Sequence, residues 1–293
     1  MSLKLIAGCG YLGFKAAEAW LDDGCEVAAF TRSHHNAAQF AKRGLQPLVL
    51  DLAAPDSAIE LPAADTVLWA VGFDRTAAAS REQVWLDGLK WLVNQLLAPP
   101  RRFIYISSTS VYGEVNGELV DESATVNPTS EGGQCCLQAE QMLRNACGEK
   151  FPSTEVVVLR MAGIFGPDRL LRRIDDLRNK TPLPGEPDHW LNLIHVDDAV
   201  RAIQYTSTAE VVPKVINVVN SETVTRRQYY SRLAELAGTD PPVFGESGVV
   251  TSVRQRGGNK RVVSRYADFQ DRFEFNNVIN GLDDSFQRTP SPR

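Results

Sequence analysis

Three glycines in the segment GCGYLG have the spacing of a phosphate-binding turn. Gly8, Gly10 and Gly13 follow an apolar stretch, residues 3–8, and open a stretch with helical periodicity, residues 12–23. In this context the first glycine allows a tight turn, the second lets the backbone approach a pyrophosphate, and the third lets the helix pack closely on the strand. The beginning of the helix also favours an anion. The pattern predicts that a dinucleotide cofactor contacts Gly8, Gly10, Tyr11, Leu12 and Gly13.

The end of the next apolar stretch indicates which nicotinamide cofactor binds. An acidic residue there would accept a hydrogen bond from the 2′-hydroxyl of NAD, whereas a basic residue would bind the 2′-phosphate of NADP. The chain has Thr31-Arg32-Ser33 at this point, without an acidic residue. Arg32 offers several N–H donors to a phosphate, although surface arginines are common. We expect NADP(H) to be preferred, with NAD(H) as the alternative.

Short apolar segments alternate with amphipathic ones through the first half of the chain. Strands are expected at residues 3–8, 26–31, 46–50, 66–71, 103–107 and 155–160, and helices at 12–23, 35–43, 78–97 and 134–147. Strands that are apolar throughout and separated by helices predict a parallel sheet covered on both faces. The expected fold is α/β, a doubly wound Rossmann sheet. Its strand ends complete the predicted cofactor site with Asp51, Leu52, Ala70, Val71 and Ser107.

The rhythm of the sequence changes after about Gly163, where prolines become frequent and the segments become shorter. We expect a Rossmann domain at residues 1–162 and a smaller, mainly substrate-binding region at residues 163–293. Residues of about 190–220 are expected to return to the Rossmann domain. The polar last residues, 282–293, are expected to form a loose tail.

Composition and charge exclude several classes of protein. Hydrophobic residues make up 43% and charged residues 23% of the 293 residues, which is ordinary for a globular protein. The net charge of −5 argues against a nonspecific nucleic-acid surface. No apolar run approaches the ~20 residues of a membrane span. Small-molecule chemistry is therefore favoured over binding to nucleic acid or membrane.

The five cysteines have neither the number nor the spacing of a disulfide framework or a zinc site. Their count is odd, two of them are adjacent, and no CxxC occurs. Reduced thiols fit a cytoplasmic protein, and the first residues do not have the form of a signal peptide. Cytoplasmic localisation, without a metal, is the expectation.

Three later segments resemble the extended short-chain dehydrogenase/reductase family, and within it the NAD-dependent epimerase/dehydratase group. The segments are ISSTSVYGE from Ile106, LRMAGIFGPDR from Leu159 and NLIHVDDAVRAI from Asn192. With the glycine turn, the resemblance covers roughly residues 3–202, and the similarity continues in the stretch that begins at Val215. It implies an oxidoreductase fold that binds NAD(P), a nucleotide-sugar as a common substrate, and a homodimer formed by the helices at 78–97 and 134–147.

The catalytic motif of that family is incomplete here. The resemblance implies a Ser that polarises the substrate oxygen, a Tyr that exchanges the proton, and a Lys that lowers the pKa of this Tyr. Ser108 matches the Ser, but Gly132 stands at the Tyr position and Cys136 at the Lys position. Ser108 is therefore the main catalytic candidate. Tyr112 is a second candidate, against the alternative that it only packs.

Other reactive residues have plain structural explanations. Cys135 and Cys136 are at the beginning of a helix, where a thiol pKa can fall, but buried unreactive thiols are more common. The resemblance gives the segment around His195 a structural role, with Asp197 or Asp198 capping the next helix. We expect these residues to support the fold.

Two basic stretches mark the region that would hold a substrate. Arginines and a lysine in these stretches could bind a phosphate or carboxylate, although a solvated helix face explains the first group equally well. The residues are Arg169, Arg172, Arg173, Arg254, Arg256, Lys260 and Arg261. The expected partner is a small molecule, either anionic or a nucleotide-sugar.

Two functions remain open from the sequence. The first is an atypical NADP(H)-dependent oxidoreductase, favoured by Ser108 and the basic stretches. The second is a redox or metabolite sensor that binds NADP(H) without turnover, favoured by the loss of Tyr and Lys at positions 132 and 136. The sequence alone therefore does not decide whether the chain is an enzyme.

Overall fold

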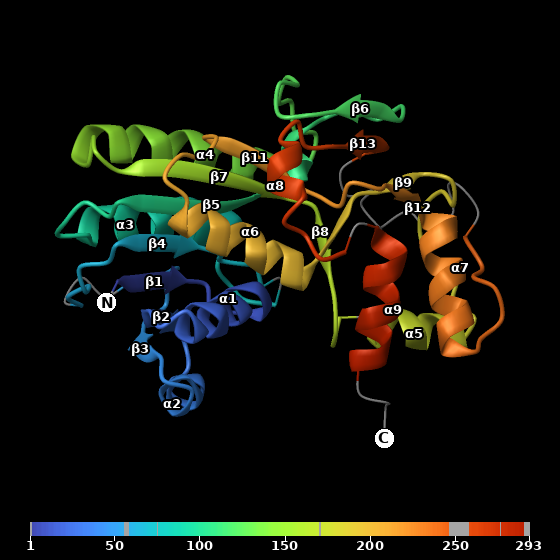
Figure 1. Ribbon diagram of the computed structural model, residues 1–293, viewed down its shortest axis with the longest axis horizontal. Helices are drawn as coiled ribbons and strands as arrows, with labels where there is room; N and C mark the ends of the chain where they lie inside the picture. Colours follow the sequence, from blue (N-terminus) through green and yellow to red (C-terminus); the bar gives the residue numbers. More distant parts are fainter. Residues whose placement is uncertain are drawn as a thin grey trace. The chain divides into compact units, whose positions relative to one another are not determined.

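Seven strands form a central sheet flanked by helices in the computed structural model (Figure 1). The structure describes residues 2–55, 59–74, 76–169, 171–245, 258–275 and 277–289. Strand residues such as Leu5, Ile6 and Leu68 are fully buried, because helices cover both faces of a parallel sheet. The predicted doubly wound α/β fold is confirmed.

The elements of the central sheet and its helices occupy most of the first 218 residues. The strands are β1 (Leu3–Ala7), β2 (Glu26–Thr31), β3 (Gln46–Val49), β4 (Thr66–Trp69), β5 (Arg102–Ser108), β7 (Glu155–Met161) and β11 (Val215–Val218). The helices are α1 (Tyr11–Asp22), α2 (His34–Lys42), the π-helix η1 (Gln83–Asp87), α3 (Gly88–Gln95), the 3₁₀ helix η2 (Thr109–Val111), α4 (Glu131–Lys150) and α6 (Val196–Thr208).

Shorter elements make up the remainder of the described chain. The strands are β6 (Glu118–Val120), β8 (Gly163–Phe165), β9 (Trp190–Leu191), β10 (Leu193–His195), β12 (Val224–Thr225) and β13 (Lys260–Val262). The helices are α5 (Leu171–Arg178), α7 (Arg226–Ala237), α8 (Ala267–Gln270) and α9 (Val278–Arg288). These strands pair two by two, as β8 with β10, β9 with β12, and β6 with β13.

The order of the central strands is β11-β7-β5-β4-β1-β2-β3. β1 lies between β2 and β4 and is parallel to both. The chain builds outward from β1 through β2 to β3 and then returns to the other side of β1 at β4. In such a sheet, ligands bind at the carboxyl ends of the strands, at the point where the order reverses. This point lies between β1 and β4, next to the glycine turn.

The helices on each face of the sheet contact one another, by apolar packing on one face and by a hydrogen bond on the other. α3 packs against α4 on one face, where Leu89, Leu92 and Leu143 are fully buried. On the other face, α1 is joined to α6 by a hydrogen bond of 3.1 Å from the indole of Trp20 to the hydroxyl of Ser207. These contacts join neighbouring helices on each face of the sheet.

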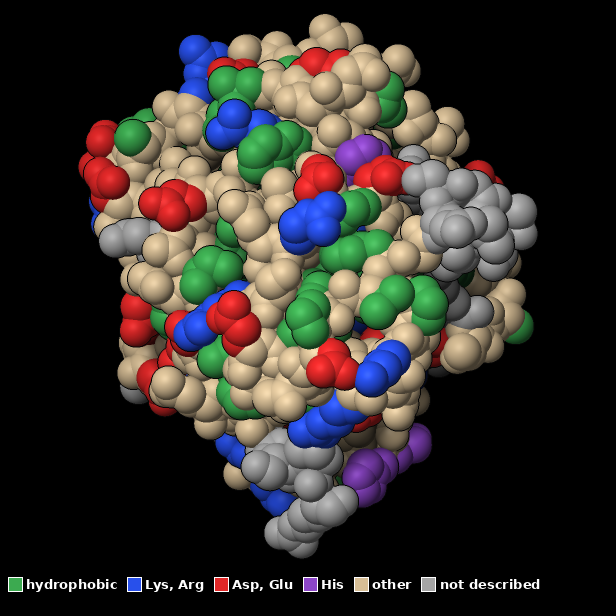
Figure 2. Space-filling view, turned by 90° about the vertical axis from the view of Figure 1, so that its right-hand side faces the viewer, with side chains coloured by type: hydrophobic (Ala, Val, Ile, Leu, Met, Phe, Trp, Pro, Cys, Tyr) green, Lys and Arg blue, Asp and Glu red, His purple; other side chains and the backbone are tan. Residues whose placement is uncertain are grey.

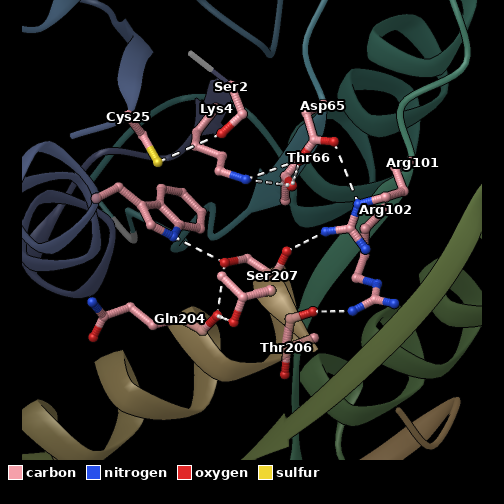
Figure 3. Close-up of polar contacts among 12 residues, drawn as sticks. Ser2, Lys4, Cys25, Asp65, Thr66, Arg101, Arg102, Gln204, Thr206 and Ser207 are labelled. Atoms are coloured by element: carbon pink, nitrogen blue, oxygen red, sulfur yellow. Dashed lines mark hydrogen bonds and ion pairs between the residues drawn. The ribbon is translucent and has the colours of Figure 1, made fainter. Parts of the chain in front are cut away.

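A polar network stabilises the opposite edge of the sheet, where the strands begin (Figure 3). Lys4 of β1 donates to the carboxylate of Asp65 and the hydroxyl of Thr66, at 2.9 and 3.0 Å. Arg101 and Arg102, at the beginning of β5, donate to the last carbonyl groups of α6, among them that of Ser207. Cations at a helix C-terminus satisfy its free carbonyls and its dipole.

The chain divides into two compact units by its contacts. The first contains the chain through Val111, together with Glu131–Arg160 and Val200–Ile216. The second contains Tyr112–Ser130, Met161–Ala199 and the chain from Asn217 onward. The predicted cofactor residues and Ser108 belong to the first unit, and Tyr112 belongs to the second.

The second unit has its own apolar core, in which α5, α7 and α9 contribute side chains such as Ile174, Leu233 and Leu282. α7 begins with a capping box formed by Thr225 and Gln228. α9 begins after Asn277, whose side chain accepts from the N–H of Asn280. The prediction of a loose tail from residue 282 is therefore wrong up to residue 288, because α9 packs an apolar face into this core. Among the described residues, no helix combines the length and the apolar character of a membrane span.

Candidate cofactor site and active-site region

The glycine turn lies between β1 and α1, and two of its three glycines have a steric reason. Gly8 has a φ of +90°, and a Cβ there would lie 2.5 Å from the backbone of Ala70. A Cβ on Gly13 would lie 2.3 Å from the carbonyl oxygen of Gly8. A Cβ on Gly10 would meet no described atom within 4 Å, apart from its chain neighbours. Gly8 and Gly13 are therefore packed against backbone, whereas Gly10 faces open space at the N-terminus of α1.

The other predicted cofactor residues come from the ends of the next strands. Asp51 and Leu52 follow β3, and Ala70 and Val71 follow β4. Ser107 is the second-last residue of β5. Since these strands are parallel, their carboxyl ends meet at the edge that carries the glycine turn. Asp51 is exposed, Ala70 and Val71 are half-buried, and Leu52 and Ser107 are buried.

Arg32 directly follows β2 at the same edge. Its side chain is 57% exposed and forms an ion pair with Asp74, with 3.3 Å between Nη2 and Oδ2. Hydrogen bonds from Thr76 and then from Arg32 lower the pKa of Asp74. The carboxylate is therefore charged at neutral pH, and it holds the guanidinium that sequence reasoning assigned to a 2′-phosphate.

Ser108 ends β5 and is half-buried; its hydroxyl accepts from the backbone N–H of Ser110 at 3.1 Å. The preceding Ser107 donates to the carboxylate of Glu140 on α4, at 2.6 Å. Glu140 is fully buried, and its two oxygens also accept from Arg160, at 3.1 and 2.8 Å. Successive strand residues point to opposite sides, so this network holds Ser107 on α4 and turns Ser108 away from it.

Tyr112 lies in the second unit, and only 1% of it is exposed. Its hydroxyl donates to the side-chain oxygen of Asn217 at 2.9 Å. Its backbone carbonyl accepts from the buried ammonium of Lys260. A catalytic role for Tyr112 would require its hydroxyl to leave Asn217, and that role stays a prediction.

The two positions that the resemblance assigns to a proton relay both lie on α4. Gly132 is in its first turn, and Cys136 is one turn further on. Cys136 is buried and hydrogen-bonds the hydroxyl of Tyr105, and burial raises the pKa of the thiol to about 12. Burial likewise raises the pKa of Cys135. Both thiols are protonated at neutral pH, in agreement with the expectation that they are buried and unreactive.

Sequence reasoning missed Arg81, which lies next to Gly132. A Cβ on Gly132 would have the Nε atom of Arg81 as its nearest described neighbour, at 3.7 Å. The guanidinium lies 4.3 Å from the ring centroid of Phe73 and 5.8 Å from that of Trp85. Helical periodicity predicted a helix from residue 78, but the helix begins after Ser80. Ser80 and Gln83 form a capping box with two reciprocal hydrogen bonds. Their spacing in the sequence was the signal that could have placed the start of the helix.

Several basic residues of the second unit have acidic or aromatic partners. Arg173 pairs with Asp176 at 2.8 Å, and Arg261 stacks on the ring of Trp190 at 4.7 Å. Lys260 is buried, and burial lowers its pKa. On the side where α5, α7 and α9 lie, acidic and basic side chains are neighbours and form no patch of one sign (Figure 2). Arg254, Arg256 and the side chain of Arg172 lie outside the described part of the structure.

His195 is buried in the second unit, as expected for a structural residue. Its Nδ1 accepts from the N–H of Asp197 at 3.2 Å, so Nε2 carries the proton and donates to Ser285 at 3.0 Å. Asp197 and Asp284 both pair with Arg288. His195, Asp197 and Asp284 lie close enough together to hold a metal ion. Their ligand atoms, however, already form hydrogen bonds or pair with Arg288. Asp198 accepts from the backbone of residues 274 and 275.

The fold and the glycine turn together define a dinucleotide-binding Rossmann protein. Residues 5–219 match the NAD dependent epimerase/dehydratase family, and the chain belongs to that family. Among curated proteins it is 29% identical to Protein YeeZ of Escherichia coli K12 over 252 residues. The match covers 84% of this chain and 88% of that protein.

Solved structures with the same fold include a UDP-glucuronic acid 4-epimerase and a protein in complex with UDP-glucose. A UDP-glucuronic acid 4-epimerase from Bacillus cereus in complex with NAD aligns with a TM-score of 0.78 and 17% identity, over 98% of each chain. MoeE5 in complex with UDP-glucose and NAD aligns with a TM-score of 0.76 and 20% identity, also over 98% of each chain. At these identities the likeness establishes the fold alone.

Proposed function

We propose that the protein binds NADP(H) in preference to NAD(H) and acts as an atypical oxidoreductase of its family on an anionic small molecule, of the nucleotide-sugar type. The open space at Gly10 carries this proposal, since a Cβ there would fill the place that a pyrophosphate needs. The exposed guanidinium of Arg32, at the next strand end, supports the choice of cofactor. A bound nicotinamide would supply the hydride.

Ser108 is the catalytic residue of this proposal. It is half-buried at the end of β5, beside the strand ends that would hold the cofactor. Its hydroxyl can donate to a substrate oxygen, because the contact that the structure gives it uses the oxygen as an acceptor. A proton would then come from water or from Tyr112, since Gly132 and Cys136 supply none at neutral pH.

A second function, cofactor sensing without turnover, has one observation in its favour. The position of the expected Lys is held by Cys136, a buried thiol whose pKa is raised to about 12. Such a group gives no cation to a neighbouring acid. Oxidation of NADPH by carbonyl compounds, with a Ser108→Ala control, separates an enzyme from a sensor.

The cofactor is tested by titrating the purified protein with NADPH and with NADH and comparing Gly10→Ala with Gly148→Ala. Both positions have room for a Cβ among the described residues, so both variants should fold. Gly10→Ala should weaken NADPH binding at least ~tenfold, a loss of about 1.4 kcal/mol, whereas Gly148→Ala, on α4, should bind normally. If neither cofactor binds to the wild type, or if both variants bind equally, the proposal fails.

A further inference from the structure

Arg81 is held in an unusually fixed environment for an arginine at the beginning of a helix. Its side chain is 15% exposed. One face of the guanidinium lies over the ring of Phe73, and the ring of Trp85 is 5.8 Å away. Nε lies beside Gly132, at 3.7 Å from the position that a Cβ would take there. Such a guanidinium has lost most of its conformational freedom before any ligand arrives, and this favours binding.

The cluster of Phe73, Arg81 and Trp85 is rich in donors and poor in acceptors. Nε of Arg81 and Nε1 of Trp85 are both buried, and neither has a hydrogen-bond partner among the described residues. Folded proteins rarely leave buried N–H groups unpaired, and clusters of such groups occur where a ligand or ion belongs. Trp85 is also part of the π-helix η1, a distortion that is frequent at functional sites.

The electrostatic surroundings of Arg81 favour an anion. Gly132 is in the first turn of α4, so the positive end of the helix dipole lies beside the guanidinium. The described structure gives the guanidinium one acceptor, the carboxylate of Glu131, with 3.1 Å between Nη1 and Oε1. The Glu131 side chain is 56% exposed, so water screens its carboxylate and competes for it.

We propose that Arg81 binds the carboxylate of an acidic substrate, which takes the place of the Glu131 carboxylate. Arginine suits this role because its planar fork matches a carboxylate and because it stays protonated. For the same reason it exchanges no proton, so Arg81 selects and orients the substrate. The proposal rests on the proposed function only in naming the ligand a substrate, since carboxylate binding can be measured without cofactor.

The test is a titration of the full chain with glucuronate, using glucose as the uncharged counterpart at constant ionic strength. The chain has five tryptophans, and a Trp85→Phe variant assigns the indole N–H of Trp85 in ¹H–¹⁵N spectra. Glucuronate should shift this signal in a saturable way, and glucose should not. Arg81→Gln should abolish the shift, whereas Glu131→Gln should tighten binding ~two- to fivefold, because the carboxylate that competes for Arg81 is lost.

Arg43→Gln is the matched control. Arg43 also pairs with a glutamate, Glu18 at 2.7 Å, and also lies over a phenylalanine ring, but it is 63% exposed. This variant should respond to glucuronate as the wild type does. The proposal is overturned if glucuronate gives no saturable shift, if the shift persists in Arg81→Gln, or if Glu131→Gln binds more weakly. The cofactor titration is a separate experiment, so a failure of the proposed function can be distinguished from a failure of the carboxylate site.

Discussion

The guanidinium of Arg32 and the carboxylate of Asp74 form an ion pair with 3.3 Å between Nη2 and Oδ2. Arg32 follows β2 and Asp74 follows β4, so the pair joins segments on the two sides of β1. A 2′-phosphate that binds Arg32 must compete with this carboxylate. If the proposed contact with the 2′-phosphate forms, the pair should lower the affinity for NADP(H) below what Arg32 alone would give.

Removing either partner should change NADPH binding in opposite directions. Asp74→Asn should tighten it, because a negative charge that holds Arg32 and repels the phosphate is lost. Arg32→Ala should weaken it about tenfold or more, the scale of a hydrogen bond to a charged group. Calorimetric titration of both variants measures these changes.

NADH is the control for this pair, since it lacks the 2′-phosphate. Its affinity should stay nearly unchanged in both variants. An equal loss of NADH and NADPH binding in Arg32→Ala would mean that Arg32 does not contact the 2′-phosphate. Weaker NADPH binding in Asp74→Asn would show that Asp74 positions Arg32 instead of competing for it.

The central sheet could be predicted because its signals are local. Continuous apolar strands and helical periodicity recur at regular intervals, and a GxGxxG turn marks where the first strand ends. Helix α9 was missed because its polar residues, such as Asp283 and Asp284, dominate the sequence from residue 282. Its apolar face has a buried core to pack against only once α5 and α7 are in place, and this information is not local.

The candidate site was predictable only in part, for a similar reason. The glycine turn and Arg32 follow from position along the strands. The neighbourhood of Arg81 and Gly132 brings together residues 51 positions apart, from the segment just before η1 and from α4, and no pattern in either segment implies the other. Likewise, the bond between Tyr112 and Asn217 depends on tertiary contacts, which sequence spacing does not contain.

Arg102 should be important for stability but not for cofactor binding. Its side chain is fully buried at the beginning of β5, where it donates to Glu155 and to the carbonyls of Thr206 and Ala209. Arg102→Met should lower the free energy of unfolding by about 3 kcal/mol, because breaking a buried charged network leaves its partners unpaired. Urea denaturation measures the loss.

Glu155→Gln provides the matched comparison, since the Glu155 side chain is 52% exposed. Glu155→Gln should lower the free energy of unfolding by less than Arg102→Met does, because the Gln oxygen can still accept from the buried guanidinium. NADPH affinity should be unchanged in both variants under native conditions, because Arg102 is at the opposite end of β5 from the cofactor edge. A loss of affinity in folded Arg102→Met would contradict this separation of roles.

His195 should make the protein less stable in mild acid. The ring packs between Phe165 and Phe275, with centroids 5.3 and 4.2 Å away. Burial lowers the pKa of His195, although the carboxylates of Asp197 and Asp284 oppose this, while Arg288 adds to it. The folded state therefore holds this proton less tightly than the unfolded state, where the pKa is about 6.5.

The sign of the pH effect follows from this difference. Above pH 6.5 both states carry a neutral His195, and its contribution to stability is fully present. As the pH falls below 6.5, the unfolded state takes up a proton that the folded state does not, so the free energy of unfolding falls. Between pH 7.5 and 5.5 the loss cannot exceed about 1.4 kcal/mol, which corresponds to one pH unit below the pKa of the unfolded state.

Urea denaturation at the two pH values measures this loss, and His195→Gln identifies its source. The variant cannot titrate at this position, so its free energy of unfolding should change less between pH 7.5 and 5.5, even where its absolute stability is lower. All other titratable groups are present in both proteins and should affect both alike. An identical pH dependence in wild type and variant would mean that His195 keeps its ordinary pKa in the folded protein.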